Sequence, residues 1–137
     1  MRVRVIGRLH EAPVDVQRSI RAAEERTNAG RRMTLNICFN YSGRAEIVDA
    51  ARALLAASIP PARLSEELFA EHLYTAGQPE VDLIIRTAGE LRTSNFLLWQ
   101  GAYAELVFCP KLWPDFSPAD FEGALDEFAR RERRFGG

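Results

Sequence analysis

Two arginines and a serine stand close together in the middle of the 137-residue chain, where they could bind an anion. Arg86 follows the apolar run DLII, and Arg92 and Ser94 come shortly after it, where a second apolar run begins. A guanidinium donates paired hydrogen bonds to phosphate oxygens, and the free N–H groups of a helix N-terminus also favour an anion. Glu105, further along, adds a carboxylate that could hold a metal ion. These residue types together predict a phosphate site.

A strand has to deliver the first arginine to this site, and a helix has to present the second arginine and the serine. We expect a strand over residues 82–86, a short loop over residues 87–91, and an apolar helix that starts at residues 92–95. In an open parallel sheet, the ligand crevice lies beyond the carboxyl ends of the strands. The predicted phosphate site therefore lies at the carboxyl edge of a sheet.

A second strand-to-helix turn has the same character. The strand predicted over residues 33–39 runs into Asn40, and Gly43 allows a tight bend. Arg44 then falls in the first turn of the next helix. This turn would also lie at the carboxyl edge of the sheet, although Asn40 could simply satisfy the turn and Arg44 could be a surface residue.

Strand and helix patterns alternate along the chain, which is typical of an α/β fold. We expect a single domain over residues 1–137, built as a parallel β-sheet flanked by helices. About four strands are few for such a sheet and would leave apolar edges uncovered. We therefore expect the fold to be incomplete without a further chain or segment. The remaining predicted elements are strands over residues 1–7 and 105–109, and helices that begin near Pro13, Ser65 and Ser117.

Composition argues against several classes of function. The net charge of -1 gives no electrostatic reason to expect nucleic acid as a partner. Cys38 and Cys109 both lie in apolar runs, as the reduced thiols of intracellular proteins do. The sequence has no signal peptide pattern and no apolar run long enough to span a bilayer. We therefore expect a cytoplasmic protein that does not bind nucleic acid.

Four stretches of the sequence carry a resemblance to a known family: NYSGRAEIVDAAR, DLIIRTAGELRTSNFLLWQGAYAEL, LWPDF and the closing RERRFGG. In this order they resemble the C-terminal portion of a cis-prenyltransferase of the undecaprenyl diphosphate synthase (isoprenyl transferase) type. The resemblance implies that family's fold and a dimeric transferase of isoprenoid biosynthesis. Such a prenyltransferase uses Mg²⁺ to condense isopentenyl diphosphate with an allylic diphosphate, forming Z double bonds.

The resemblance also implies roles for individual residues. Arg86, Arg92 and Ser94 would bind the diphosphate of isopentenyl diphosphate, and Glu105 would help to hold Mg²⁺. The other positions that match the family's pattern are Asn40, Gly43 and Arg44, which would line the same pocket, and Arg134 and Gly136, whose RxG motif would reach toward the active site across the dimer interface.

The sequence departs from the family in one large respect. It contains no Asp-Gly dipeptide, so the family's Asp-Gly-Asn-Gly-Arg loop is missing and no catalytic aspartate can be assigned in this chain. Leu91 stands where many bacterial members have histidine, and Ala88 and Ser42 replace glycines. We expect a prenyltransferase chain that is inactive alone. It would form a homodimer, or a heteromer with a chain carrying the missing N-terminal half, and its lipid product would place it at the periphery of a membrane.

Two other functions stay open: a non-catalytic partner subunit of a heteromeric cis-prenyltransferase, and an inactive diphosphate-binding remnant. The candidate residues also have simpler interpretations. Arg86 could be a surface residue or half of an ion pair, Ser94 a helix cap, and Glu105 a charged residue that opens a strand. The terminal RERRFGG would ordinarily be a solvated helix end.

Overall fold

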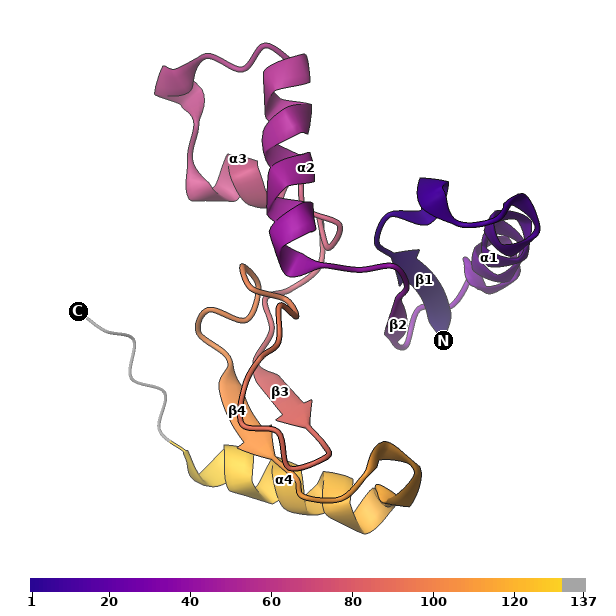
Figure 1. Ribbon diagram of the computed structural model, residues 1–137, viewed down its shortest axis with the longest axis vertical. Coiled ribbons are helices and arrows are strands. Elements are labelled where there is room, and N and C mark those ends of the chain that lie inside the picture. Colours follow the sequence, from indigo (N-terminus) through magenta and orange to yellow (C-terminus); the bar gives the residue numbers. More distant parts are fainter. Residues whose placement is uncertain (132–137) are drawn as a thin grey trace. The chain divides into compact units, whose positions relative to one another are not determined.

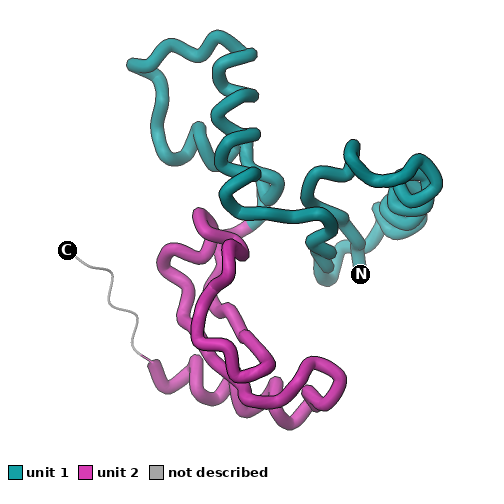
Figure 2. The backbone as a smooth tube through the Cα atoms, in the orientation of Figure 1, with its two compact units in different colours: residues 1–78 teal, residues 79–137 magenta. Residues whose placement is uncertain are grey.

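The computed structural model describes residues 1–131, and these form two compact units, divided between residues 78 and 79 (Figure 2). Each unit contains one pair of parallel strands with helices beside it, so the α/β class is confirmed. The described strands form two separate two-stranded sheets. The single domain expected over the whole chain stays a prediction.

The first unit is built on β1 (Arg2–Ile6) and β2 (Thr34–Cys38), which are connected through α1 (Val14–Thr27) (Figure 1). The two strands are parallel, and Val5 lies opposite Ile37. A parallel pair requires a crossover connection, and α1 provides it. The alternation of basic and β-branched residues thus correctly predicted the strand β1.

Side chains of α1 cover the outer edge of β1. The backbone N–H of Val3 donates to Thr27 Oγ1 at 3.0 Å, and the N–H of Val5 donates to Glu24 Oε1 at 2.8 Å. An unpaired strand edge is a template for unwanted pairing with another chain. Because these two side chains accept hydrogen bonds from the outward N–H groups of Val3 and Val5, this edge of the two-stranded sheet is less able to pair with another strand.

Serine caps begin two further helices of the first unit, α2 (Gly43–Ala56) and α3 (Glu66–Ala70), and the start of α3 at Ser65 was expected from the sequence. Ser42 Oγ accepts from the backbone N–H of Ala45 at 3.2 Å, and Ser65 Oγ accepts from that of Leu68 at 3.2 Å. Such caps satisfy donors that a helix N-terminus leaves free. The unit also contains two short 3-10 helices without such caps, η1 (Leu9–Glu11) and η2 (Pro61–Arg63).

The second unit holds β3 (Leu83–Arg86), β4 (Glu105–Phe108) and α4 (Pro118–Arg130), with the 3-10 helix η3 (Trp113–Asp115). β3 and β4 are parallel. Ser117 and Asp120 form a capping box at the start of α4. Buried apolar side chains from β4 and α4, including Val107, form a small core between them.

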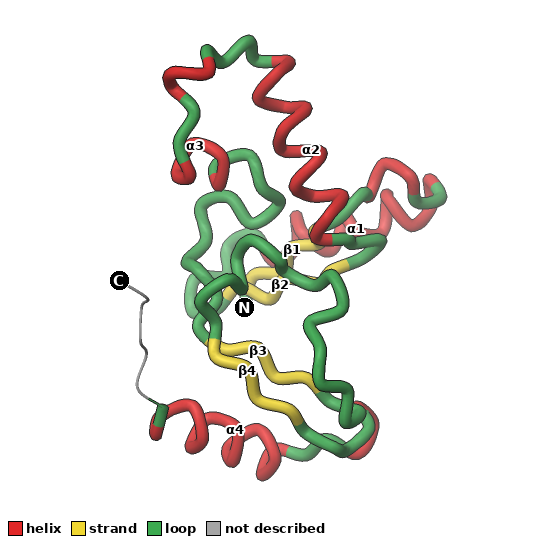
Figure 3. The backbone as a smooth tube through the Cα atoms, turned by 60° about the vertical axis from the view of Figure 1, so that its left-hand side comes forward, coloured by secondary structure: helices red, strands yellow, loops and turns green. Residues whose placement is uncertain are grey.

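The helix expected to start at residues 92–95 is wrong. Between β3 and β4 the chain runs through turns, which Figure 3 draws as a loop. Ser94, Asn95 and Leu97 have φ angles of 49°, 63° and 45°. These angles are left-handed and incompatible with a right-handed helix. The apolar spacing that suggested a helix is therefore produced by side chains presented from successive turns.

Apolar side chains of β2 and the residue that follows it remain substantially exposed. Leu35, Ile37 and Phe39 keep 39%, 46% and 42% of their surface exposed. Apolar strand residues at this level of exposure fit the expectation that further polypeptide is needed to cover the sheet. None of the helices among residues 1–131 is long and apolar enough to cross a membrane.

Candidate functional site

A tight loop after β3 positions the candidate anion site. Ala88 and Gly89 both have left-handed φ angles, 69° and 67°. Their backbone N–H groups donate to the carbonyl oxygens of Lys111 at 2.6 Å and Cys109 at 3.0 Å. These two bonds tie the loop to the segment that leaves β4. The chain reverses here, so that the next residue, Glu90, comes back beside Arg86.

The structure brings Arg86, Arg92 and Ser94 together around Glu90. The Oε2 atom of Glu90 lies 3.8 Å from Nη2 of Arg86 and forms an ion pair with Nη1 of Arg92. Arg92 Nε donates to Ser94 Oγ at 3.1 Å. The three residues predicted from the sequence therefore form one cluster, although turns and not a helix N-terminus assemble it. Their role in binding a diphosphate stays a prediction.

The cluster has the charge and exposure that an anion site needs. Its two guanidiniums and one carboxylate give it a formal charge of about +1. The Arg86 side chain is 25% exposed and the Arg92 side chain is 66% exposed, so both can be reached from solvent. A guanidinium has five N–H donors in a planar fork, so these contacts leave donors for phosphate oxygens.

Glu90 is the member of this cluster that the sequence analysis did not single out. A usable signal was present, because the residue stands four positions after one arginine and two before the other. Such spacing places a carboxylate near both guanidiniums only if the chain turns sharply. That turn depends on the left-handed conformation of residues 88 and 89, which the sequence alone does not reveal.

Glu105, the predicted metal ligand, lies at the other end of the two strands. In the parallel register it is opposite Leu83, whereas Arg86 is opposite Phe108. Three residues of strand separate the two positions, which corresponds to about 10 Å. Glu105 Oε2 accepts from Arg131 Nη1 at 3.0 Å. Within one chain, the register therefore separates the backbone of Glu105 from that of Arg86.

The donor set does not make a complete metal site by itself. Residues 1–131 contain no group of three or more His, Cys, Asp or Glu side chains that could hold a metal ion. Mg²⁺ is commonly held by one or two carboxylates together with substrate phosphates and water. Glu105 could therefore supply a single ligand, and its ion pair with Arg131 would have to open first. The expected Mg²⁺ site stays a prediction.

The second predicted turn, in the first unit, is held by Arg8. Asn40 has a φ angle of 48°, and its backbone oxygen accepts from the N–H of Arg8 at 3.2 Å. Its side-chain Nδ2 donates to the Arg8 carbonyl at 3.1 Å and to Glu11 Oε2 at 2.9 Å. Gly43 is the buried first residue of α2, and Arg44 is exposed in its first turn. Whether these residues share a pocket with Arg86 stays a prediction.

Two carboxylates of α2 anchor the base of this turn. Glu46 is 1% exposed, and it accepts from the Tyr41 hydroxyl at 2.5 Å and from the backbone N–H of Tyr74 at 2.8 Å. Asp49 accepts from Arg8 Nε at 2.8 Å and Nη2 at 2.9 Å, and from the Tyr74 hydroxyl at 2.6 Å. The network thus links α2 to the segment after β1 and to the segment after α3.

The Arg8 pair sets the acid–base properties of this network. Its hydrogen bonds, and then that from the Tyr74 hydroxyl, lower the pKa of Asp49 to about 2. Burial, followed by the bond to Asp49, raises the pKa of Tyr74 to about 12. The pKa of Arg8 is also raised, chiefly by Asp49, so the pair stays charged at neutral pH. A bidentate arginine–carboxylate pair has the geometry that gives a measurable contribution to stability.

Replacing Asp49 with asparagine is expected to remove part of the acid sensitivity of the first unit. The folded pKa of about 2 lies below the ordinary value of 3.8, so the native carboxylate contributes stability above about pH 5 and loses it as the pH falls toward 2. After solvent screening the contribution is about 1 kcal/mol. Urea unfolding at pH 6 and pH 3, followed by circular dichroism, should show a smaller pH difference in Asp49→Asn than in the wild type. An unchanged difference would contradict this assignment.

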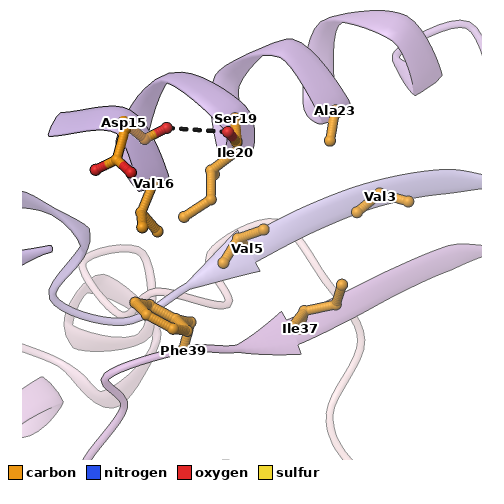
Figure 4. Close-up of a pocket in the computed structure, with 9 residues that line it drawn as sticks. All are labelled: Val3, Val5, Asp15, Val16, Ser19, Ile20, Ala23, Ile37 and Phe39. Atoms are coloured by element: carbon orange, nitrogen blue, oxygen red, sulfur yellow. Dashed lines mark hydrogen bonds between the residues drawn. The ribbon is translucent and has the colours of Figure 1, made fainter. Parts of the chain in front are cut away.

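An apolar groove lies between α1 and the β1–β2 sheet in the same unit. It has a volume of about 350 Å³. Figure 4 shows Val16 and Ile20 of α1 pointing toward Val5 of β1, with Phe39 at one end of the groove. Asp15 lies at the same end, and the backbone carbonyl of Asp15 accepts from the Ser19 hydroxyl at 2.9 Å. The lining has no cation to balance an anion, so this groove is not a second phosphate site.

Two predicted residues, Arg134 and Gly136, lie outside the described residues. Their expected role at a dimer interface therefore stays a prediction. The described chain ends at Arg131, which follows the last residue of α4 and also donates to the Leu106 carbonyl at 2.9 Å. The start of the terminal motif is thus attached to the beginning of β4.

Comparisons with known proteins point to one group. A family model described as "Putative undecaprenyl diphosphate synthase" matches residues 1–136. The isoprenyl transferase of Thermotoga maritima is 50% identical over 139 residues, which cover 100% of this chain and 60% of that protein. The decaprenyl diphosphate synthase of Mycolicibacterium smegmatis is 49% identical over 140 residues, which cover 99% of this chain and 48% of that protein.

The backbone is similar to that of a solved structure. The crystal structure of lavandulyl diphosphate synthase from Lavandula x intermedia, in complex with dimethylallyl diphosphate, superposes with a TM-score of 0.92 at 39% identity. The match covers 99% of this chain and 60% of that one. The chain therefore spans between about half and three fifths of the length of these relatives.

Proposed function

Because the chain belongs to the undecaprenyl diphosphate synthase family of prenyltransferases, we propose that it supplies the isopentenyl diphosphate-binding half of a cis-prenyltransferase site. The complete reaction would be a Z-condensation of isopentenyl diphosphate with an allylic diphosphate. The observation that carries the proposal is the convergence of Arg86 and Arg92 beside Ser94. A diphosphate has several negative charges and oxygen acceptors, which this cluster can meet with guanidinium and hydroxyl donors.

The chain's own residues would bind and orient the five-carbon substrate. Arg86 at the end of β3 is the less exposed of the two guanidiniums, so its bonds to phosphate oxygens would be the stronger ones. Arg92 would bind from the solvent side. The Ser94 hydroxyl, which already accepts from Arg92, keeps its own proton to donate to a phosphate oxygen. Holding the diphosphate at these donors would leave the hydrocarbon end free to meet the second substrate.

Magnesium would neutralise charge on the diphosphate leaving group of the allylic substrate. Glu105 could offer it one carboxylate oxygen, but the described residues provide no complete site. We therefore assign no step of the reaction to the ion in this chain alone. Further ligands would have to come from the substrate phosphates and from polypeptide that this chain does not span.

The proposal includes a partner, which would be a second copy of this chain or a chain with the missing N-terminal half. The sequence of this chain has no Asp-Gly-Asn-Gly-Arg loop, so a donor site for the allylic diphosphate cannot be assigned in it. The exposed apolar residues of β2 are also available for coverage by further polypeptide. A non-catalytic partner subunit and an inactive diphosphate-binding remnant are the competing functions.

Binding and turnover measured separately test the proposal. Calorimetric titration of the chain with isopentenyl diphosphate should show binding, while incubation with Mg²⁺, isopentenyl diphosphate and farnesyl diphosphate should yield no product from the chain alone. Product should appear when a chain with the missing half is added, and Arg86→Ala should abolish it. Failure to bind isopentenyl diphosphate would refute the half-site. Product from the chain alone would refute the need for a chain with the missing half, and binding without turnover beside any such chain would favour the remnant.

A further inference from the structure

The geometry points to Glu90 as a positioning residue that holds Arg86 and Arg92 in the arrangement that receives a diphosphate. This inference rests on the proposed function and concerns a residue to which the sequence resemblance assigned no role. Glu90 would not contact the reacting atoms. It would act through the two guanidiniums, by fixing where their remaining N–H donors point before the substrate arrives.

One oxygen atom makes the connection. Glu90 Oε2 lies 3.8 Å from Arg86 Nη2 and pairs with Arg92 Nη1. The same atom is shut off from solvent and accepts no hydrogen bond of good geometry within residues 1–131. A buried carboxylate oxygen is costly unless nearby charge compensates it, and here two guanidiniums do so. The attraction therefore draws both arginines toward a single point.

The backbone makes that point rigid. Glu90 follows the left-handed pair Ala88 and Gly89, whose N–H groups are bonded to the carbonyl oxygens of Cys109 and Lys111. Two main-chain bonds to the segment after β4 leave the following residue little freedom to move. The position of the carboxylate is thus fixed by backbone hydrogen bonds to the segment after β4, and not by the flexible arginine side chains.

Arg92 is held on two sides, which matters because its side chain is 66% exposed. Nε donates to Ser94 Oγ, and Nη1 pairs with Glu90. These contacts fix the plane of the guanidinium and leave its Nη2 for a ligand oxygen. Without the carboxylate, the serine would be left to orient this long side chain, which otherwise samples many rotamers.

A carboxylate beside an anion site has two opposing effects, and their sizes decide the outcome. Its charge repels the diphosphate, but 38% of the Glu90 side chain is exposed, so at about 6 Å solvent and salt screen the repulsion to about threefold in affinity. Immobilising two arginines in advance spares the binding step an ordering cost equivalent to about thirtyfold in affinity. The positioning effect is the larger, so loss of the carboxylate should weaken binding about tenfold.

Calorimetric titration of the full chain with inorganic pyrophosphate tests this inference. Glu90→Gln keeps the size of the side chain and removes its charge, so the Kd should rise about tenfold. Glu90→Asp keeps the charge and should recover part of the loss. Glu122→Gln removes an exposed carboxylate of α4 and should bind as the wild type does. A Glu90→Gln variant that binds as tightly as the wild type, or more tightly, overturns the inference.

A double-mutant cycle shows whether Glu90 acts through its neighbours. In an Arg92→Ala background, adding Glu90→Gln should change the Kd by less than about threefold, because much of the ordering benefit is already lost. An effect as large as in the wild-type background would mean that Glu90 acts in another way. Failure of the wild type to bind either pyrophosphate or isopentenyl diphosphate would overturn the proposed function together with this inference. Binding by the wild type with no effect of Glu90→Gln would overturn the inference alone.

Discussion

Replacing Arg86 with alanine is expected to weaken the binding of isopentenyl diphosphate about a hundredfold. The residue ends β3, its side chain is only 25% exposed, and its guanidinium faces the cluster through Glu90. A hydrogen bond to a charged group contributes about 1.5–3 kcal/mol, and loss of a bidentate pair at the lower end of that range corresponds to about a hundredfold in Kd. Titration calorimetry measures the change directly, and Arg86→Lys should recover only part of it because it cannot bind in bidentate fashion.

Control variants distinguish a direct contact at the site from a general effect of the protein's charge on diphosphate binding. Arg18→Ala removes an exposed arginine of α1 and should leave the Kd within about twofold of the wild type. Arg92→Ala should have an intermediate effect, because that side chain is more exposed than Arg86. If Arg86→Ala binds within about threefold of the wild type while remaining folded, this residue does not contact the diphosphate and the half-site is misassigned.

The largest effect on stability is expected for Glu46→Ala, at about 3 kcal/mol of the free energy of unfolding. The carboxylate is 1% exposed and accepts from the Tyr41 hydroxyl and from the backbone N–H of Tyr74. Removing it leaves both donors without this acceptor and opens a cavity inside the first unit. Each buried group left without a partner costs about 1–3 kcal/mol, which together with the cavity gives the estimate.

Urea unfolding can assign this loss to the correct unit. Both tryptophans, Trp99 and Trp113, belong to the second unit, whereas α1 and α2 provide helical circular dichroism in the first. The circular dichroism transition should shift more than the tryptophan fluorescence transition. Glu46→Gln keeps the volume and should cost less, and Tyr41→Phe, which removes one donor, should cost about 1 kcal/mol. A loss below 1 kcal/mol for Glu46→Ala would show that the buried carboxylate does not hold this unit together.

Most of the secondary structure was predictable from local patterns. Strand patterns indicated β1 and β2, and helical periodicity after Gly43 indicated α2. Serines followed by helical periodicity indicated α3 and α4, each of which begins after the expected serine. These signals are local because a strand or a cap depends on a few neighbouring side chains and backbone groups. The family could also be recognised from the sequence, because its motifs are long contiguous stretches of the chain. The family match over residues 1–136 confirms it.

The segment after Arg92 was mispredicted for a physical reason. Its apolar residues recur at a spacing that suits a helix, but the same residues can also be presented from consecutive turns. The choice was made by backbone conformations at Ser94, Asn95 and Leu97, which carry left-handed φ angles. Such angles cost energy for these residue types and persist only where the surrounding structure compensates.

The sequence by itself determined the family, the order of the elements apart from the helix wrongly expected after Arg92, and the presence of two arginines and a serine suited to a diphosphate. Only the tertiary structure decided that Glu90 stands between those arginines, that Glu105 lies at the opposite end of its strand pair, and that Arg8 pairs with Asp49. The reason is that local patterns specify how a few residues fold, whereas loop reversals, strand register and contacts between distant residues depend on how the whole unit packs.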